Sequence, residues 1–223
     1  EWKLEYGLTD WWNVLASVPY ISSHYRDDNT DLLRTGAGDI YVRTKVRLVE
    51  EPLVASVQIS GKIPSAYDPN ENPIGDGQVD LESRLLVSRA WTFELSRDSP
   101  ARFVRTPALG VAFVNLEGAF TARNEDQANE FPLYLEAGMT PLQRLMLVGT
   151  LDAVISVKST DEQTEDIAKW GVLAIVNVLG DGFANVFRQG GPTVNVEVGY
   201  NSIFAGRNTT GGFEVFAKVG LFY

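Results

Sequence analysis

Charged residues recur at every second position in several stretches of the chain, and their spacing points to electrostatic rather than covalent chemistry. The stretch 39–48, "DIYVRTKVRL", places the cations Arg43, Lys45 and Arg47 two residues apart. Because successive side chains of a β-strand point to opposite faces, these three cations would share one face. Fixed charges along such a face select solutes by their charge and orient them.

The same alternation places charges of both signs on one polar face of the predicted strands. Lys62 and Arg84, on the two strands that follow, extend the cationic group, and carboxylates predominate on later strands. Opposed cationic and anionic walls would create a transverse field, and the alternative is that the charges neutralise each other across a filled interior. The predicted polar-face residues are Arg43, Lys45, Arg47, Lys62, Arg84, Asp80, Glu82, Glu117, Glu136, Asp152, Glu197, Glu214 and Lys218.

Residue constellations for catalysis or metal binding are scarce. The chain has no cysteine and one histidine, which argues against a thiolate nucleophile and a sulfur- or histidine-rich metal centre. Ser22 and His24 share a face, but nucleophilic catalysis needs a third, orienting group, and no such residue is evident. We therefore predict no enzymatic activity and no cofactor.

The loop "DPNENPIGDG" contains a weak candidate for a metal site. It offers the oxygen ligands Asp68, Asn70 and Asn72 and so resembles a calcium-binding loop. Its sixth position is proline and no glutamate stands at the twelfth, so an ordinary solvated loop is the alternative.

Period-two alternation of apolar and polar residues runs through the whole chain and predicts an all-β protein. Short connections at 8–10, 49–52 and 139–143 alternate with long polar ones, which is typical of the two rims of an outer-membrane barrel. The long ones are 26–38, 67–78, 124–130, 158–169 and 205–211. The eleven predicted strands cover about 1–7, 11–25, 39–48, 53–66, 79–88, 108–123, 131–139, 143–158, 170–180, 193–200 and 213–223.

Two architectures would produce this alternation. A soluble β-sandwich or barrel packs its apolar face inward, whereas a transmembrane barrel turns that face to lipid. Aromatic residues near strand ends on the apolar face fit the interfacial girdles of the second architecture. These are Trp2, Trp12, Tyr20, Phe120, Trp170, Tyr200 and Tyr223. We expect one domain, 1–223, that forms a single antiparallel transmembrane β-barrel.

The expected number of strands is about twelve, because bacterial single-chain barrels normally have an even number. The twelfth strand would either precede Glu1 or lie within 92–107, and the first is favoured because the chain starts in mid-strand.

Motifs within residues 5–65 resemble one known family. They are the turn "YGLTD" at Tyr6–Asp10, the pair Pro19-Tyr20, the loop exit Gly36–Asp39 and Lys45 on the following strand. This stretch resembles the outer-membrane family labelled as meta-pathway phenol-degradation proteins. After Pro64 the chain departs from the family, which often has Thr-Gly there. The resemblance implies a roughly twelve-stranded barrel that passes hydrophobic or aromatic compounds, and a C-terminal strand that the barrel-assembly machinery recognises.

These features together predict a location and a set of partners. A net charge of −10 argues against a nucleic-acid partner. We expect a bacterial outer-membrane protein with a periplasmic C-terminus, in contact with membrane lipid and lipopolysaccharide. The long connections 92–107 and 181–192 would expose Arg97, Arg102, Arg105, Phe183 and Phe187 to a protein partner.

The expected function is a narrow channel for small solutes. One alternative is a non-conducting structural barrel or anchor within a larger outer-membrane assembly. A remote alternative is a soluble β-barrel that binds a ligand.

Overall fold

Strands make up nearly all of the chain that the computed structural model describes. The described residues are 2–26, 31–65, 77–95, 109–123, 128–157, 166–179, 183, 193–207 and 211–222. No helix in these segments is long and apolar enough to cross a membrane. The predicted all-β class is therefore confirmed.

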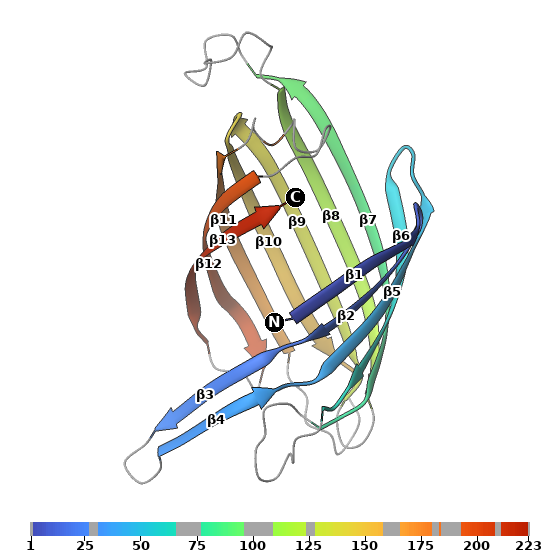
Figure 1. The fold of residues 1–223 in the computed structure, drawn as a ribbon, viewed down its shortest axis with the longest axis vertical. Coiled ribbons are helices and arrows are strands. Elements are labelled where there is room, and N and C mark those ends of the chain that lie inside the picture. Colours follow the sequence, from blue (N-terminus) through green and yellow to red (C-terminus); the bar gives the residue numbers. More distant parts are fainter. Residues whose placement is uncertain are drawn as a thin grey trace. The chain divides into compact units, whose positions relative to one another are not determined.

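The described residues form thirteen strands, which make up one large sheet and one small ribbon (Figure 1). Eleven of them form the sheet in the order β1-β2-β5-β6-β7-β8-β9-β10-β11-β12-β13, and β3 pairs with β4. The strands are β1 (Trp2–Thr9), β2 (Trp12–Val18), β3 (Tyr20–Arg26), β4 (Asp31–Ala37), β5 (Ile40–Val49), β6 (Val54–Ile63), β7 (Asp80–Glu94), β8 (Leu109–Arg123), β9 (Glu130–Leu142), β10 (Leu145–Ser156), β11 (Asp166–Leu179), β12 (Thr193–Arg207) and β13 (Phe213–Phe222).

The chain folds into two compact units. The first comprises Glu1–Leu86, Gly118–Phe131 and Ser156–Thr164, and the second comprises Val87–Glu117, Pro132–Ile155 and Glu165–Tyr223. The long strands β7, β8, β9 and β10 each contribute residues to both units. The single domain predicted for 1–223 stays a prediction.

The β3–β4 ribbon corrects the predicted loop at 26–38. Proline has no backbone N–H, and the predicted strand 11–25 is interrupted at Pro19. The chain then continues as β3, and residues 31–37 pair with it as β4, from Tyr20 opposite Ala37 to Arg26 opposite Asp31. Figure 1 shows the two strands running on as a ribbon from β2 and β5. The surrounding Asp, Asn and Gly residues concealed this strand in the sequence.

One face of the sheet is exposed and the other is sheltered, and the apolar side chains lie on the exposed face. In β9, Leu133 and Leu135 are 45% and 37% exposed, while Tyr134 and Glu136 between them are partly buried and Thr140 is 1% exposed. The same alternation continues in β10, where Leu147 is exposed and Met146 is buried. We call these the exposed face and the sheltered face.

Polar side chains make up much of the buried interior. Among the described residues, the largest side chains that are fully buried are all polar: Asn177, Thr140 and Ser17. This distribution reverses the usual one, in which apolar residues are inside and polar residues face solvent. The buried polar residues among the described positions are Ser17, Asp39, Ser56, Ser60, Lys62, Gln78, Asp80, Thr121, Thr140, Ser156 and Asn177.

Glycines on the sheltered face of the second unit make room for phenyl rings of adjacent strands. A Cβ at Gly138 would lie 2.5 Å from Cε1 of Phe113, so the ring lies directly over the glycine backbone. Phe216 covers Gly199 in the same way, and these two residues are opposite each other in register. Such aromatic–glycine pairs replace the missing side chain and help to hold the strand register.

Replacing Gly138 by valine should destabilise the sheet, because the new Cβ would meet Phe113 at 2.5 Å and Val148 at 3.1 Å. We expect the free energy of unfolding to fall by about 1–3 kcal/mol, as overpacking usually causes. Denaturant unfolding followed by tryptophan fluorescence measures this loss. Gly149→Val is the control, because a Cβ there meets nothing within 4 Å. Equal losses in both variants would contradict the prediction.

Candidate functional site

Side chains on the sheltered face of β10–β13, in the second unit, lie in successive cross-strand rows. The first row contains opposite charges on neighbouring strands, the third is apolar, and the fourth again contains an opposed carboxylate and ammonium. The rows are Asp152–Lys169–Ile203, Thr150–Gly171–Asn201–Glu214, Val148–Leu173–Gly199–Phe216 and Met146–Ile175–Glu197–Lys218. The side chains of the sheltered face therefore change from charged to apolar and back to charged along the strands.

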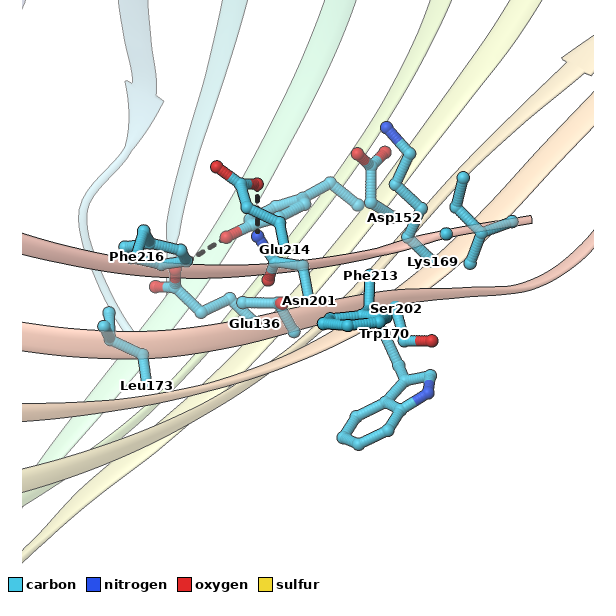
Figure 2. A pocket seen from close by; sticks show the side chains of 14 residues that line it. Glu136, Asp152, Lys169, Trp170, Leu173, Asn201, Ser202, Phe213, Glu214 and Phe216 are labelled. Atoms are coloured by element: carbon cyan, nitrogen blue, oxygen red, sulfur yellow. Dashed lines mark hydrogen bonds between the residues drawn. The ribbon is translucent and has the colours of Figure 1, made fainter. Parts of the chain in front are cut away.

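A cavity of about 500 Å³ lies over the first three rows of this face. Figure 2 shows Glu136, Asn201 and Glu214 near one another, with Asp152 and Lys169 together at another part of the cavity. The lining residues are Tyr134, Glu136, Thr150, Asp152, Lys169, Trp170, Leu173, Asn201, Ser202, Ile203, Gly212, Phe213, Glu214 and Phe216. Ionic, amide and aromatic groups thus line one space.

Hydrogen bonds hold the carboxylates of this cavity in place. Glu136 accepts a bond from the Tyr134 hydroxyl at 2.7 Å and one from Asn115 Nδ2 at 2.9 Å. Glu214 accepts a longer bond from Asn201 Nδ2 at 3.4 Å. Both carboxylates therefore have neutral donors as partners and keep their negative charge available.

Gly171 has no side chain, and this leaves room for the side chains of Thr150 and Asn201 in the second row. A Cβ at Gly171 would lie 2.6 Å from Thr150 Oγ1 and would also overlap Asn201 Oδ1. With glycine at this position, Thr150 and Asn201 approach from the two neighbouring strands. Asn201 can then reach Glu214.

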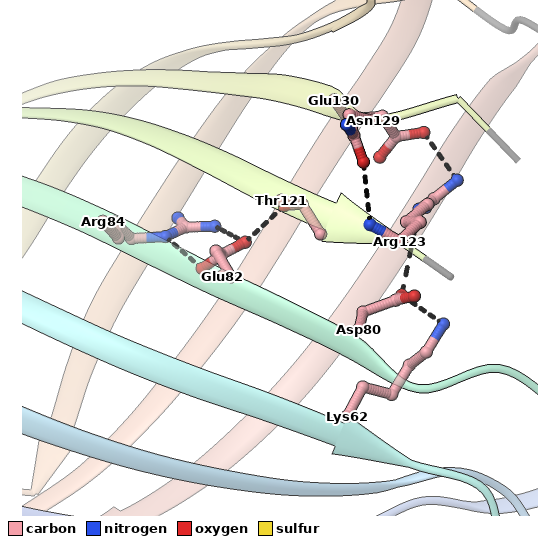
Figure 3. Close-up of polar contacts among 8 residues, drawn as sticks. All are labelled: Lys62, Asp80, Glu82, Arg84, Thr121, Arg123, Asn129 and Glu130. Atoms are coloured by element: carbon pink, nitrogen blue, oxygen red, sulfur yellow. Dashed lines mark hydrogen bonds and ion pairs between the residues drawn. The ribbon is translucent and has the colours of Figure 1, made fainter. Parts of the chain in front are cut away.

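The sheltered face of the first unit carries a network of ion pairs (Figure 3). Lys62 Nζ lies 2.5 Å from Asp80 Oδ2, and both side chains are less than 10% exposed. Arg123 joins this pair to a further carboxylate, with Nε 3.8 Å from Asp80 and Nη1 2.8 Å from Glu130. The network crosses four strands, from β6 to β9.

Arg84 is paired within its own strand. Its guanidinium donates two bonds to Glu82, at 2.9 and 3.1 Å, and Thr121 donates a third to the same carboxylate at 3.3 Å. Lys62 and Arg84, which were predicted to belong to a cationic wall, are thus each paired with a carboxylate on the sheltered face.

The three cations of β5 are half-buried and lie on the sheltered face as predicted. The Arg43 guanidinium lies 5.1 Å from the centre of the Tyr41 ring, and Arg47 forms an ion pair with Glu50 at 3.5 Å. Lys45 and Arg47 line a second cavity, of about 420 Å³, together with Glu5 and Asn13. This cavity lies within the first unit.

The structure brings some predicted carboxylates together and separates others. Glu136, Asp152 and Glu214 share the large cavity, whereas Glu197 lies opposite Lys218 in the fourth row. Glu117 lies half-buried on the sheltered face of β8, outside the lining of that cavity.

The predicted polar face omitted several charged residues that lie on the sheltered face, among them Glu5, Lys169, Arg123 and Glu130. Lys169 was missed because the predicted strand began at 170, four residues after the start of β11 at Asp166. Arg123 is the last residue of the predicted strand 108–123, and Glu130 falls within the predicted loop 124–130 although it begins β9. Applying the period-two alternation over the full observed lengths of these strands places Lys169, Arg123 and Glu130 on the polar face.

Phe183 is buried, which corrects the prediction that it is exposed to a partner. It is 5% exposed, packs with Met146 and Val148, and donates its N–H to the Gln143 carbonyl at 3.2 Å. Its phenyl ring covers part of the apolar row, which local sequence cannot indicate. The other residues predicted to be exposed, Arg97, Arg102, Arg105 and Phe187, lie outside the described residues.

Most of the predicted aromatic girdle lies on the exposed face. Trp2, Trp12, Tyr20, Phe120 and Trp170 are exposed, and Tyr223 lies outside the described residues. The Tyr200 ring is partly buried between the rings of Trp170 and Phe213, with centroids 5.4 and 6.1 Å away.

The two minor candidates gain no support as sites. Ser22 shares a hydrogen bond with Thr35, and His24 is opposite Leu33 in the β3–β4 ribbon. Asp68, Asn70 and Asn72 lie outside the described residues. Within the described segments, no three His, Cys, Asp or Glu side chains lie close enough to bind a metal ion.

Comparison with known proteins found no match for this chain among protein-family models, curated proteins or solved structures. The function must therefore be inferred from the two faces of the sheet and from the two cavities.

Replacing Asp80 by asparagine should strongly destabilise the first unit. It leaves the Lys62 ammonium, which is 8% exposed, without its carboxylate, and breaking a buried ion pair costs about 3–5 kcal/mol. Glu50→Gln is the control, because the Glu50–Arg47 pair is exposed and should contribute less than about 1 kcal/mol. Denaturant unfolding compares the two variants. A loss for Asp80→Asn no larger than that of the control would refute the prediction.

Proposed function

We propose that this protein is an outer-membrane β-barrel that forms a narrow channel for small solutes. The observation that carries the proposal is the reversed distribution of side chains. Large apolar residues such as Leu133, Val172 and Val219 are 45–72% exposed, while Lys62, Asp80 and Asn177 are buried. Apolar side chains are stable in such positions when the surrounding medium is hydrocarbon, as it is for the outer surface of a transmembrane barrel.

The lengths of the strands support a membrane location. A transmembrane strand needs about 9–11 residues when it is tilted. Strands β5–β13 contain 10–15 residues each. The proposal requires that the sheet closes on itself, since an open edge would leave backbone groups unpaired in lipid.

Charged groups beside the two cavities support conduction. Lys45 and Arg47 line the cavity of the first unit, and Asp152, Lys169 and Glu214 line that of the second. Water-accessible charges along a polar interior are what a channel uses to select solutes. The resemblance of residues 5–65 to the phenol-degradation family adds hydrophobic or aromatic compounds as proposed solutes.

A non-conducting structural barrel is the second candidate. The ion pairs of Lys62, Asp80 and Arg84 fill part of the sheltered face of the first unit. In the second unit, Phe183 covers the apolar row. A filled interior of this kind would suit an anchor within a larger assembly.

A soluble binding protein is disfavoured by the same distribution of side chains. Such a barrel would bury its apolar face around the ligand and expose its charged face. Here Leu135 is exposed and its neighbour Glu136 is sheltered.

Single-channel recording in a planar bilayer tests the channel directly. Discrete conductance steps are expected from the protein folded in detergent, whereas a folded protein that never conducts would favour the structural candidate. Changing Arg43, Lys45 and Arg47 together to glutamine should move the reversal potential in a KCl gradient toward the potassium potential, because three positive charges are lost. Lys3→Gln, at an exposed lysine, is the control. Unchanged conductance and ion preference would exclude these cations from the filter.

An arginine placed on the exposed face tests the membrane location. Leu135→Arg should cost about 2–4 kcal/mol if the side chain faces the bilayer midplane. Asn115→Arg is the matched control, because Asn115 lies on the sheltered face and donates to Glu136. Unfolding in lipid vesicles measures both. Similar stability of the two variants would contradict a lipid-facing Leu135.

A further inference from the structure

We infer that the large cavity of the second unit binds small organic cations that have an aromatic or apolar body. This inference rests on the proposed function, because it names the class of solute that the channel would bind. The cavity has a volume of about 500 Å³, within the range of sites that enclose small molecules.

The charge of the lining favours a cation. Three carboxylates, those of Glu136, Asp152 and Glu214, against the single ammonium of Lys169 leave two negative charges. Asp152 and Lys169 are opposite each other in register, so they compensate one another. The uncompensated charges belong to Glu136 and Glu214, whose carboxylates accept hydrogen bonds from the neutral donors Tyr134, Asn115 and Asn201.

The remaining surface of the cavity suits an apolar body. Leu173 and Phe216 belong to the apolar third row, which adjoins the row that contains Glu214. Trp170 and Phe213 also border the cavity, but their rings pack with Tyr200 on the exposed face, so the rings on the sheltered side are those of Phe216 and Tyr134. Aromatic faces attract organic cations as well as apolar groups, since the ring face carries negative potential.

The cavity is already shaped to receive such a ligand. Tyr134 and Asn115 hold Glu136 in place, so this carboxylate needs little reordering on binding. Gly171 leaves room for the Asn201 side chain that donates to Glu214. Pre-organised groups bind more tightly because less side-chain entropy is lost.

The test compares three probes with the same phenyl body and different charges: phenethylammonium, phenethyl alcohol and hydrocinnamate. Isothermal titration calorimetry on the full chain, folded in an uncharged detergent at neutral pH, measures their affinities. We expect the ammonium to bind at least about tenfold more tightly than the alcohol, and the carboxylate to bind most weakly. Equal affinities for the three probes would overturn the inference.

Two variants locate the site. Glu214→Gln and Glu136→Gln should each lower the affinity for phenethylammonium roughly tenfold, because each removes one charged partner. Glu5→Gln is the matched control, because Glu5 also accepts from an asparagine, Asn13, but lies in the other unit, and its effect should stay within about twofold. An unchanged affinity in both cavity variants, with each shown to be folded, would overturn the inference.

Conductance of the same preparation separates this inference from the channel proposal. Selective amine binding without conductance would support the site and refute the channel. Conductance without any preference for the amine would refute the site and leave the channel intact.

Discussion

Polar side chains that are shut away from solvent must find partners among themselves, and this constraint governs the sheltered face of the sheet. In the first unit, Lys62, Asp80, Arg123 and Glu130 meet it through ion pairs that link four strands, although Asp80 Oδ1 accepts no hydrogen bond from the residues that the structure describes. Losing one partner would leave a buried charge, so the pairs depend on one another. This interdependence requires β6 to β9 to keep a single register.

The second unit meets the same constraint differently. Its sheltered face alternates charged and apolar rows, and glycines let larger side chains of the adjacent strands pack against the backbone. Phe216 over Gly199 and Thr150 beside Gly171 are two examples. The cavity lies over the first three rows, whereas Phe183 covers Met146 and Val148 at the β10 ends of the third and fourth rows. One face thus contains both a closed layer and an open site.

The apolar side chains of the exposed face impose a second requirement, which concerns the medium that surrounds this face. Its leucines, valines and aromatic rings cannot be explained by packing within the sheet, because the polar residues occupy the sheltered side. The proposed hydrocarbon environment would remove this conflict and would account for both faces at once. The proposed membrane location and the proposed polar interior are therefore consequences of a single pattern.

The sequence alone determined which residues share a face, because side-chain direction in a strand alternates locally, whatever the strand pairs with. That was sufficient to predict the all-β class, the eleven strands of the large sheet and the polar-face position of Glu136, Asp152 and Glu214. Only the tertiary structure decided that Lys62 meets Asp80, that Phe183 turns inward and that residues 31–37 pair as β4. Such contacts depend on the register between strands, and irregularities such as the one at Ala168/Lys169 shift that register. Register arises from contacts between residues far apart in the chain, so it cannot be predicted from the local alternation of apolar and polar residues.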